Sequence, residues 1–145
     1  MVSLSVMGRE LLQVSVAYLL TIPIGWNRER EERSTGIRAF PIVGMAACGY
    51  ILILGPNADI SARSRVLQGV ITGIGFVGAG AILKEGITVR GPATAASVWN
   101  AGAIGAAVGL QQYEIAIILS MLNVLTLQLL LPLKNWIDRR SNGRG

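Results

Sequence analysis

The sequence of 145 residues contains no histidine and only one cysteine, Cys48. A single cysteine cannot form a disulfide within the chain, and the lack of histidine removes the commonest metal ligand and general base. The sequence also contains no P-loop, no cluster of metal-ligand spacing and no nucleophile paired with a base. We therefore expect no enzyme activity, no catalytic residue, no cofactor and no metal site.

Charged residues are also scarce, at 14% of the chain, whereas a soluble domain carries about a quarter. Hydrophobic residues make up 52% of the chain and the mean hydropathy is +0.54. The charges are clustered, and the apolar runs between them have about 16 to 20 residues, the length that spans a bilayer. The net charge of +5 is then explained by basic cytoplasmic loops rather than by a nucleic-acid surface.

The pattern predicts an all-α integral membrane protein, a compact bundle of five transmembrane helices. The predicted spans are Leu11–Trp26, Ala39–Gly55, Val66–Leu83, Ala93–Leu110 and Ile115–Leu133. Residues 1–133 would form this one domain, with the lipid bilayer as its surroundings. Residues 134–145 would form a short, basic, disordered cytoplasmic tail with no C-terminal soluble domain after it.

The distribution of lysine and arginine predicts the orientation of these spans. With five spans, the first loop, the third loop and the tail share one side of the membrane. That side carries ten basic residues, namely Arg28, Arg30, Arg33, Arg38, Lys84, Arg90, Lys134, Arg139, Arg140 and Arg144. The other side carries three, Arg9, Arg63 and Arg65. Because basic residues are enriched in cytoplasmic loops, we expect an outside N-terminus and a cytoplasmic C-terminus.

The third predicted span is rich in glycine and contains no charge. Its five glycines are Gly69, Gly73, Gly75, Gly78 and Gly80. In lipid, small residues let neighbouring helices approach closely, so we expect Val66–Leu83 to be the buried central helix with these glycines at its packing surfaces. The approach of a ligand or ion to the bare backbone is the alternative.

Ionic side chains gather after the first span and in the loop between the third and fourth spans. The cluster consists of Arg28, Glu29, Arg30, Glu32, Arg33, Arg38, Lys84 and Arg90. One interpretation is a solvated helix end, neutralised by pairs at i and i+4. The other is that some of these side chains turn inward against the third and fourth helices and form an ionic cap at the cytoplasmic end.

Polar side chains within the spans are few and uncharged. The candidates are Thr72, Thr94, Ser97, Asn100 and Asn123. They form either interhelical hydrogen bonds or a polar pathway through the bundle. Gln13 and Gln128 are further members of a possible polar seam. The middles of the spans contain no aspartate, lysine, arginine or histidine, which proton relays and ion-coupled pumps usually require.

The segments WNREREERSTGIR, RVLQGVITGIGFVGAGAIL and VRGPATAASVW resemble the MgtC/SapB family of bacterial inner-membrane proteins. The resemblance covers about residues 8–133 and implies the family's five-span, multi-pass transmembrane domain. The family's motif positions correspond here to Arg28, Glu29, Arg30, Gly36, Arg38, Gly73, Gly75, Phe76, Gly78, Gly80, Arg90, Gly91, Thr94, Ala95, Ala96 and Trp99. Pro92, Ala93 and Asn100 depart from the family pattern, and many relatives continue into a cytosolic regulatory domain.

The resemblance implies a function in adaptation to low magnesium and, in some relatives, in virulence. It implies a non-enzymatic protein that regulates a membrane partner such as the F-type ATP synthase. The alternative function is a small transporter or channel for ions or a small solute, related to magnesium. A third interpretation is a purely structural dimer module, and the bare helix faces lead us to expect a homodimer.

Overall fold

The computed structural model describes residues 3–31, 37–85 and 88–142. These residues form five helices and one short β-hairpin. In chain order the elements are α1 (Leu4–Glu31), α2 (Ala39–Leu52), α3 (Ile60–Gly80), β1 (Leu83–Glu85), β2 (Thr88–Arg90), α4 (Pro92–Gly109) and α5 (Tyr113–Asn142). The predicted helical fold is confirmed at this level.

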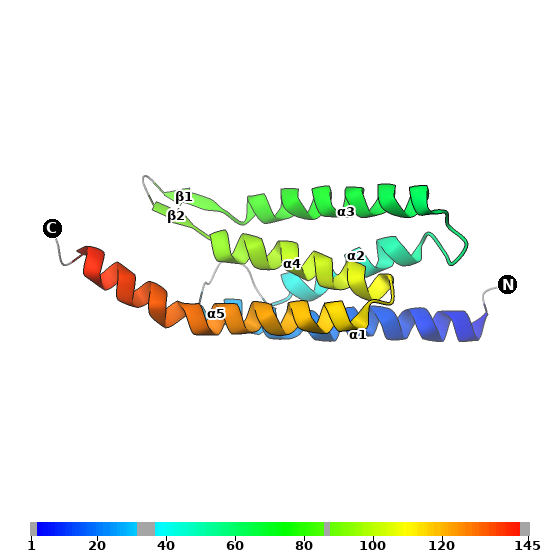
Figure 1. Ribbon diagram of the computed structural model, residues 1–145, viewed down its shortest axis with the longest axis horizontal. Coiled ribbons are helices and arrows are strands. Elements are labelled where there is room, and N and C mark those ends of the chain that lie inside the picture. Colours follow the sequence, from blue (N-terminus) through cyan, green and yellow to red (C-terminus); the bar gives the residue numbers. More distant parts are fainter. Residues whose placement is uncertain (1–2, 32–36, 86–87, 143–145) are drawn as a thin grey trace.

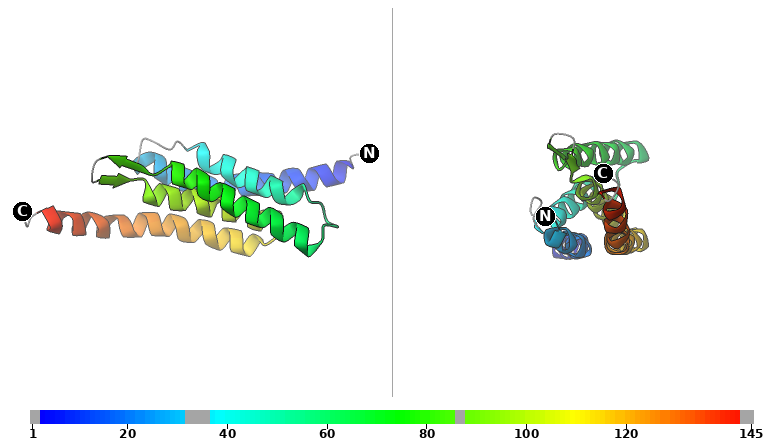
Figure 2. Two further views of the ribbon diagram at one scale, coloured as in Figure 1. Left: turned by 90° about the horizontal axis from the view of Figure 1, so that it is seen from above. Right: turned by 90° about the vertical axis from the view of Figure 1, so that its left-hand side faces the viewer.

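The helices run alternately up and down along the long axis of the molecule (Figure 1). The end of α1, the start of α2, the hairpin and the end of α5 lie at one end of the molecule. The start of α1, the α2–α3 turn and the α4–α5 turn lie at the other. The end-on view in Figure 2 places α4 between α3 on one side and α1, α2 and α5 on the other.

Helix α4 forms the centre of the bundle because its side chains are small. Ten of its residues are buried, namely Thr94, Ser97, Val98, Ala101, Gly102, Ile104, Gly105, Ala106, Ala107 and Val108. A Cβ atom on Gly105 would collide with the carbonyl oxygen of Gly44 in α2, and one on Gly102 would collide with the side chain of Ile74 in α3. Glycine at these two positions therefore permits α2 and α3 to approach α4 closely.

The prediction that the third span is the central helix is wrong. Helix α3 buries only Val70 and Gly78, and it lies on the outside of the bundle in the end-on view of Figure 2. Val70, Ile74 and Gly78 recur every four residues, and the last two of them contact α4. Consecutive residues on a helix differ by about 100° in direction. Glycines one position away from these three residues therefore do not face α4.

Of the five glycines expected to pack, only Gly78 has a close neighbour among the residues that the structure describes. A Cβ atom there would lie 3.1 Å from the carbonyl oxygen of Ala95 in α4. No atom lies within 4 Å of the corresponding position at Gly69, Gly73, Gly75 or Gly80. A packing role of these four glycines stays a prediction.

Some predicted boundaries differ from those observed. Helix α4 agrees with its predicted span to within one residue at each end, whereas α2 ends at Leu52 instead of Gly55. The expected disorder after the fifth span is wrong for the described part, because α5 continues to Asn142 with Pro132 inside it. Figure 1 shows α5 bending in its C-terminal part, as a proline inside a helix commonly causes.

The connection between α3 and α4 contains a β-hairpin that was not predicted. Its antiparallel register pairs Leu83 with Arg90, Lys84 with Val89 and Glu85 with Thr88. Gly91 then begins α4 with φ of 93°, and a Cβ atom there would collide with the carbonyl oxygen of Ala81. Glycine at this position is therefore required both by its left-handed conformation and by its close backbone neighbour.

One helix in the described part of the chain, Tyr113–Leu133, is long and apolar enough by itself to cross a membrane. Its most apolar window has a mean hydropathy of 2.1, and only 11% of that window is buried inside the structure. The segment Ala39–Leu52 is apolar but shorter.

Replacing Gly105 by alanine should destabilise the fold, because the new methyl group meets the backbone of α2, which cannot move without separating two helices. We expect the free energy of unfolding in detergent micelles to fall by about 1–3 kcal/mol. Gly73→Ala is the matched control, since open space surrounds that position. It should leave stability unchanged or raise it by up to about 1 kcal/mol. Equal losses in the two variants would contradict α4 as the centre.

Candidate functional site

The described residues form a buried polar layer where α1, α4 and α5 meet, and Arg28 is its charged member. Only 3% of the surface of Arg28 is exposed. Its Nε donates a hydrogen bond to Oγ1 of Thr94, at 3.3 Å, and Thr94 is 1% exposed in the first turn of α4. A buried guanidinium is costly unless its N–H groups are hydrogen-bonded, so Thr94 helps to hold this charge inside the bundle.

The neighbouring residue Glu29 is exposed, in contrast to Arg28. Its carboxylate accepts a hydrogen bond of 2.8 Å from the backbone N–H of Ile37, just before α2. Glu29 thus ties the end of α1 to the start of α2. The inward turn of part of the charged cluster is therefore observed for Arg28, while Glu29 and Arg38 lie at the surface.

The structure does not describe the side chains of several residues of the expected ionic cap. Glu32 and Arg33 lie outside the described residues, and the side chains of Arg30, Lys84 and Arg90 are not described. The backbones of Lys84 and Arg90 belong to the two strands of the hairpin, at the same end of the molecule as Arg28 (Figure 1). An ionic cap across these loops stays a prediction.

A second pair of hydrogen bonds extends the polar layer from α4 to α5. Oγ of Ser97, which is 2% exposed, donates to Oδ1 of Asn123 at 3.2 Å. Nδ2 of Asn100 donates to the backbone carbonyl of Leu119, also at 3.2 Å. Because Thr94, Ser97 and Asn100 recur every three residues on α4, they lie close together on its surface, and their hydrogen bonds join α4 to both α1 and α5.

Four of the five residues predicted as a polar pathway therefore belong to this layer. Thr72 is the exception, because it is exposed on α3. The wider seam is not formed either: Gln128 is exposed, and Gln13 donates to the carbonyl of Val108 near the opposite end of the bundle. The structure thus brings these polar residues together as interhelical contacts, and their role as a pathway stays a prediction.

Sequence reasoning missed three polar residues of the interior. Oγ of Ser120 in α5 donates to the carbonyl of Leu20 in α1 at 2.6 Å. Oγ1 of Thr21 donates to the carbonyls of Ala17 and Tyr18 in its own helix. Such short hydroxyl side chains satisfy themselves on helical backbone and give no periodic signal. The third residue, Asn27, gave no signal in the sequence other than its position next to Arg28.

Two side-chain amides in the layer are incompletely satisfied by the residues that the structure describes. Oδ1 of Asn27 and Nδ2 of Asn123 are buried and have no hydrogen-bond partner there. Leaving a polar atom unpaired costs about 1–3 kcal/mol. The layer is therefore a costly arrangement, which favours a specific role for it beyond packing.

Replacing Thr94 by valine should destabilise the protein, because it removes the oxygen that accepts from the buried Arg28 guanidinium while keeping the side-chain shape. We expect a loss of about 1–3 kcal/mol in the free energy of unfolding, measured in detergent micelles. Thr94→Ser keeps the hydroxyl group and should lose clearly less. If valine and serine are equally tolerated, the hydrogen bond does not hold the guanidinium in place.

Comparison with known proteins gives a consistent result. A model of the MgtC family matches residues 14–136. An uncharacterized protein of Synechocystis is 32% identical, over 92% of this chain and 57% of its own length. Protein MgtC of Brucella abortus is 33% identical, over 89% of this chain and 54% of its own length. Protein MgtC of Salmonella typhimurium is 36% identical, over 74% of this chain and 46% of its own length.

The chain therefore spans about half the length of the curated relatives that it matches. No solved structure gives a significant match. The family match covers the helices that carry the buried polar layer as well as the exposed α3. On these grounds the chain belongs to the MgtC family, whose members are membrane proteins.

Proposed function

We propose that the chain crosses the bacterial inner membrane five times, with the N-terminus outside and the C-terminus in the cytoplasm. The apolar part of α5 supports this placement, because almost none of it is covered by the rest of the chain and such a surface is unfavourable in water. The alternating course of the helices supports the orientation, since it brings the basic segments of α1, the hairpin and α5 to one end (Figure 1).

We infer that this non-enzymatic protein acts by contacting another membrane protein. The observation that carries the inference is the uncovered face of α3. Between α2 and α3 lies a groove of about 570 Å³, whose lining includes Val43, Tyr50, Gly69, Gly73 and Val77. With no side chain on Gly69 and Gly73 and no atom nearby, a transmembrane helix of a partner can approach this backbone closely.

The resemblance supplies the candidate partner and the physiological setting. We propose regulation of the F-type ATP synthase during adaptation to low magnesium, with a helix of its membrane-embedded part as the occupant of the α2–α3 groove. The lining of this groove is almost entirely apolar, which suits a helix within the bilayer rather than a hydrophilic loop. A second copy of the chain is the competing occupant of the same face and would make the expected homodimer.

The alternative function, a small transporter or channel, is favoured by the buried polar layer around Asn123. Two observations weigh against it. Thr72 lies apart from the layer, and Thr94, Ser97 and Asn100 form hydrogen bonds to other helices. The groove between α2 and α3 is apolar and lies apart from the layer.

Substitution of Gly73 by leucine should weaken regulation with little effect on the fold, because the new side chain enters the open groove and its Cβ atom has no neighbour within 4 Å. The measurement is ATP-driven proton uptake into inverted membrane vesicles that contain the F-type ATP synthase, with and without this protein. We expect the protein to change proton uptake and Gly73→Leu to abolish that change. Gly49→Leu is the matched control, since open space surrounds that α2 glycine and it does not line the groove.

The same effect of Gly73→Leu and Gly49→Leu would contradict a role for the α3 face. Cross-links from position 73 to a second copy, with none to a subunit of the synthase, would identify the homodimer as the occupant and reject the proposed partner.

Proteoliposomes that contain only this protein should show no flux of Mg²⁺ or protons above that of empty liposomes. The physical reason is that Thr94, Ser97 and Asn100 are engaged in hydrogen bonds to α1 and α5. Robust flux that is lost in Asn100→Leu would reject regulation by contact and favour the transporter instead.

A further inference from the structure

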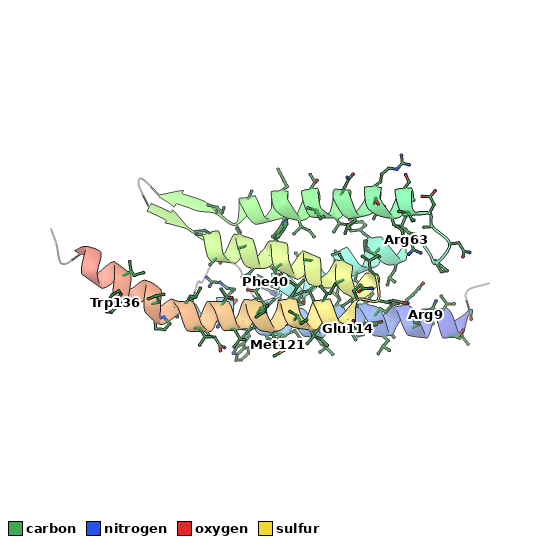
Figure 3. All side chains as sticks on the ribbon, in the orientation of Figure 1. Arg9, Phe40, Arg63, Glu114, Met121 and Trp136 are labelled. Atoms are coloured by element: carbon green, nitrogen blue, oxygen red, sulfur yellow. The ribbon has the colours of Figure 1, made fainter. Side chains whose placement is uncertain are left out.

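A polar pocket lies at the end of the molecule opposite the buried Arg28 layer. Its volume is about 290 Å³, and its lining comes from the start of α1, the end of α2 and the turn after it, the first turn of α3, and the end of α4 with the turn after it. Figure 3 labels Arg9 and Arg63 near the end at which α1 begins. The polar side chains in the lining are those of Arg9, Glu10, Gln13, Arg63 and Gln111.

Helix α1 contributes three of these side chains from one face. Gln13 follows Arg9 by four residues and Glu10 by three, so the three side chains are neighbours on the helix surface. Gln13 is buried, with 2% of its surface exposed, and its Nε2 donates to the carbonyl of Val108 at 3.4 Å. Arg9 and Glu10 are exposed. The pocket thus has a buried amide at its base and charged groups at its rim.

Arg63 is held in the lining by the turn before α3. Its Nε donates to the carbonyl of Ala58 at 3.1 Å, and its Nη2 donates to the carbonyl of Pro56 at 2.8 Å. A guanidinium has five N–H donors in a planar fork. The two bonds to the turn therefore fix the orientation of the group and leave other N–H donors for a ligand.

The balance of charge in this pocket favours an anion. Two guanidinium groups and one carboxylate line it. Neither guanidinium forms an ion pair with any residue in the described ranges 3–31, 37–85 and 88–142, and Arg9 forms no hydrogen bond there. Two arginines from different helices that line one small pocket can share a bidentate oxyanion, whereas without a ligand their charges repel each other.

We propose that this pocket binds a phosphate-type oxyanion between Arg9 and Arg63, with the Gln13 amide at its base. A phospholipid headgroup and free inorganic phosphate present the same chemistry to these groups. The proposal is independent of the α3 face and of any protein partner, so it can fail without affecting the proposed function.

The test uses the full chain purified in maltoside micelles, which contain no phosphate, and follows thermal unfolding as inorganic phosphate is added. Binding to the folded state raises the unfolding temperature with ligand concentration. Arg9→Gln should raise the apparent Kd for phosphate about tenfold or more, because a charged hydrogen bond is lost. Without phosphate its unfolding temperature should be no lower than that of the wild type, because Arg9 makes no hydrogen bond within the described chain and its removal relieves the repulsion between the two guanidinium groups.

Arg65→Gln is the matched control. It removes the same charge from α3, two residues from Arg63, but Arg65 bonds Oγ of Ser61 and does not line the pocket. Its apparent Kd should stay within about twofold of the wild type at physiological salt, where exposed charges are screened. Equal losses in Arg9→Gln and Arg65→Gln would overturn the proposal in favour of a general charge effect.

Glu10→Gln tests the sign of the ligand's charge. It removes the only carboxylate in the lining, so phosphate should bind more tightly. Weaker binding of phosphate in this variant would overturn the proposal, because a carboxylate beside a bound anion repels it.

Phosphatidylglycerol added to the same micelles distinguishes the two sources of phosphate. A stabilisation by the lipid that depends on Arg9 would support a headgroup site, and one by inorganic phosphate alone would support a free-anion site. No stabilisation that depends on Arg9, with either probe, would overturn the proposal.

Discussion

The contact of backbone with backbone around α4 is the constraint on which the rest of the structure depends. At Gly105 the helix lies against the carbonyl group of Gly44, and at Gly109 it lies against Ile51. Such contacts are available only to residues without large side chains, and in a membrane they replace the hydrophobic effect as the force that joins helices. Because every other helix packs against α4, its small side chains set the spacing of the whole bundle.

The polar interior follows from this arrangement. Thr94 and Ser97 lie on the part of α4 that the other helices cover, so they are buried and need partners. They find these partners on α1 and α5, as Arg28 and Asn123. The same arrangement leaves α3 packed mainly against α4, with fewer contacts to α2 and an open groove beside it. The buried polar layer and the uncovered face thus have a common cause.

Prediction from sequence succeeded where the signal was local and failed where it depended on neighbours. The length of the apolar runs between charged residues located the five helices and gave the bounds of α4 to within one residue. The hairpin was missed because strands of three residues carry too little pattern. The inward position of Arg28 beside the outward Glu29 was left undecided, because successive helical positions diverge by about 100° and only the packing partner shows which of them points inward.

The glycines of α3 show the same limit most clearly. Their number predicts a helix that another helix can approach closely, yet composition does not say whether the approaching helix belongs to this chain. The sequence by itself determined the helices, the order of the charged segments and the family to which the chain belongs, because each of these depends on residues near one another in the chain. Tertiary structure alone decided which helix occupies the centre and which polar groups meet. Both depend on how side chains from helices that are distant in the sequence fill the same interior space.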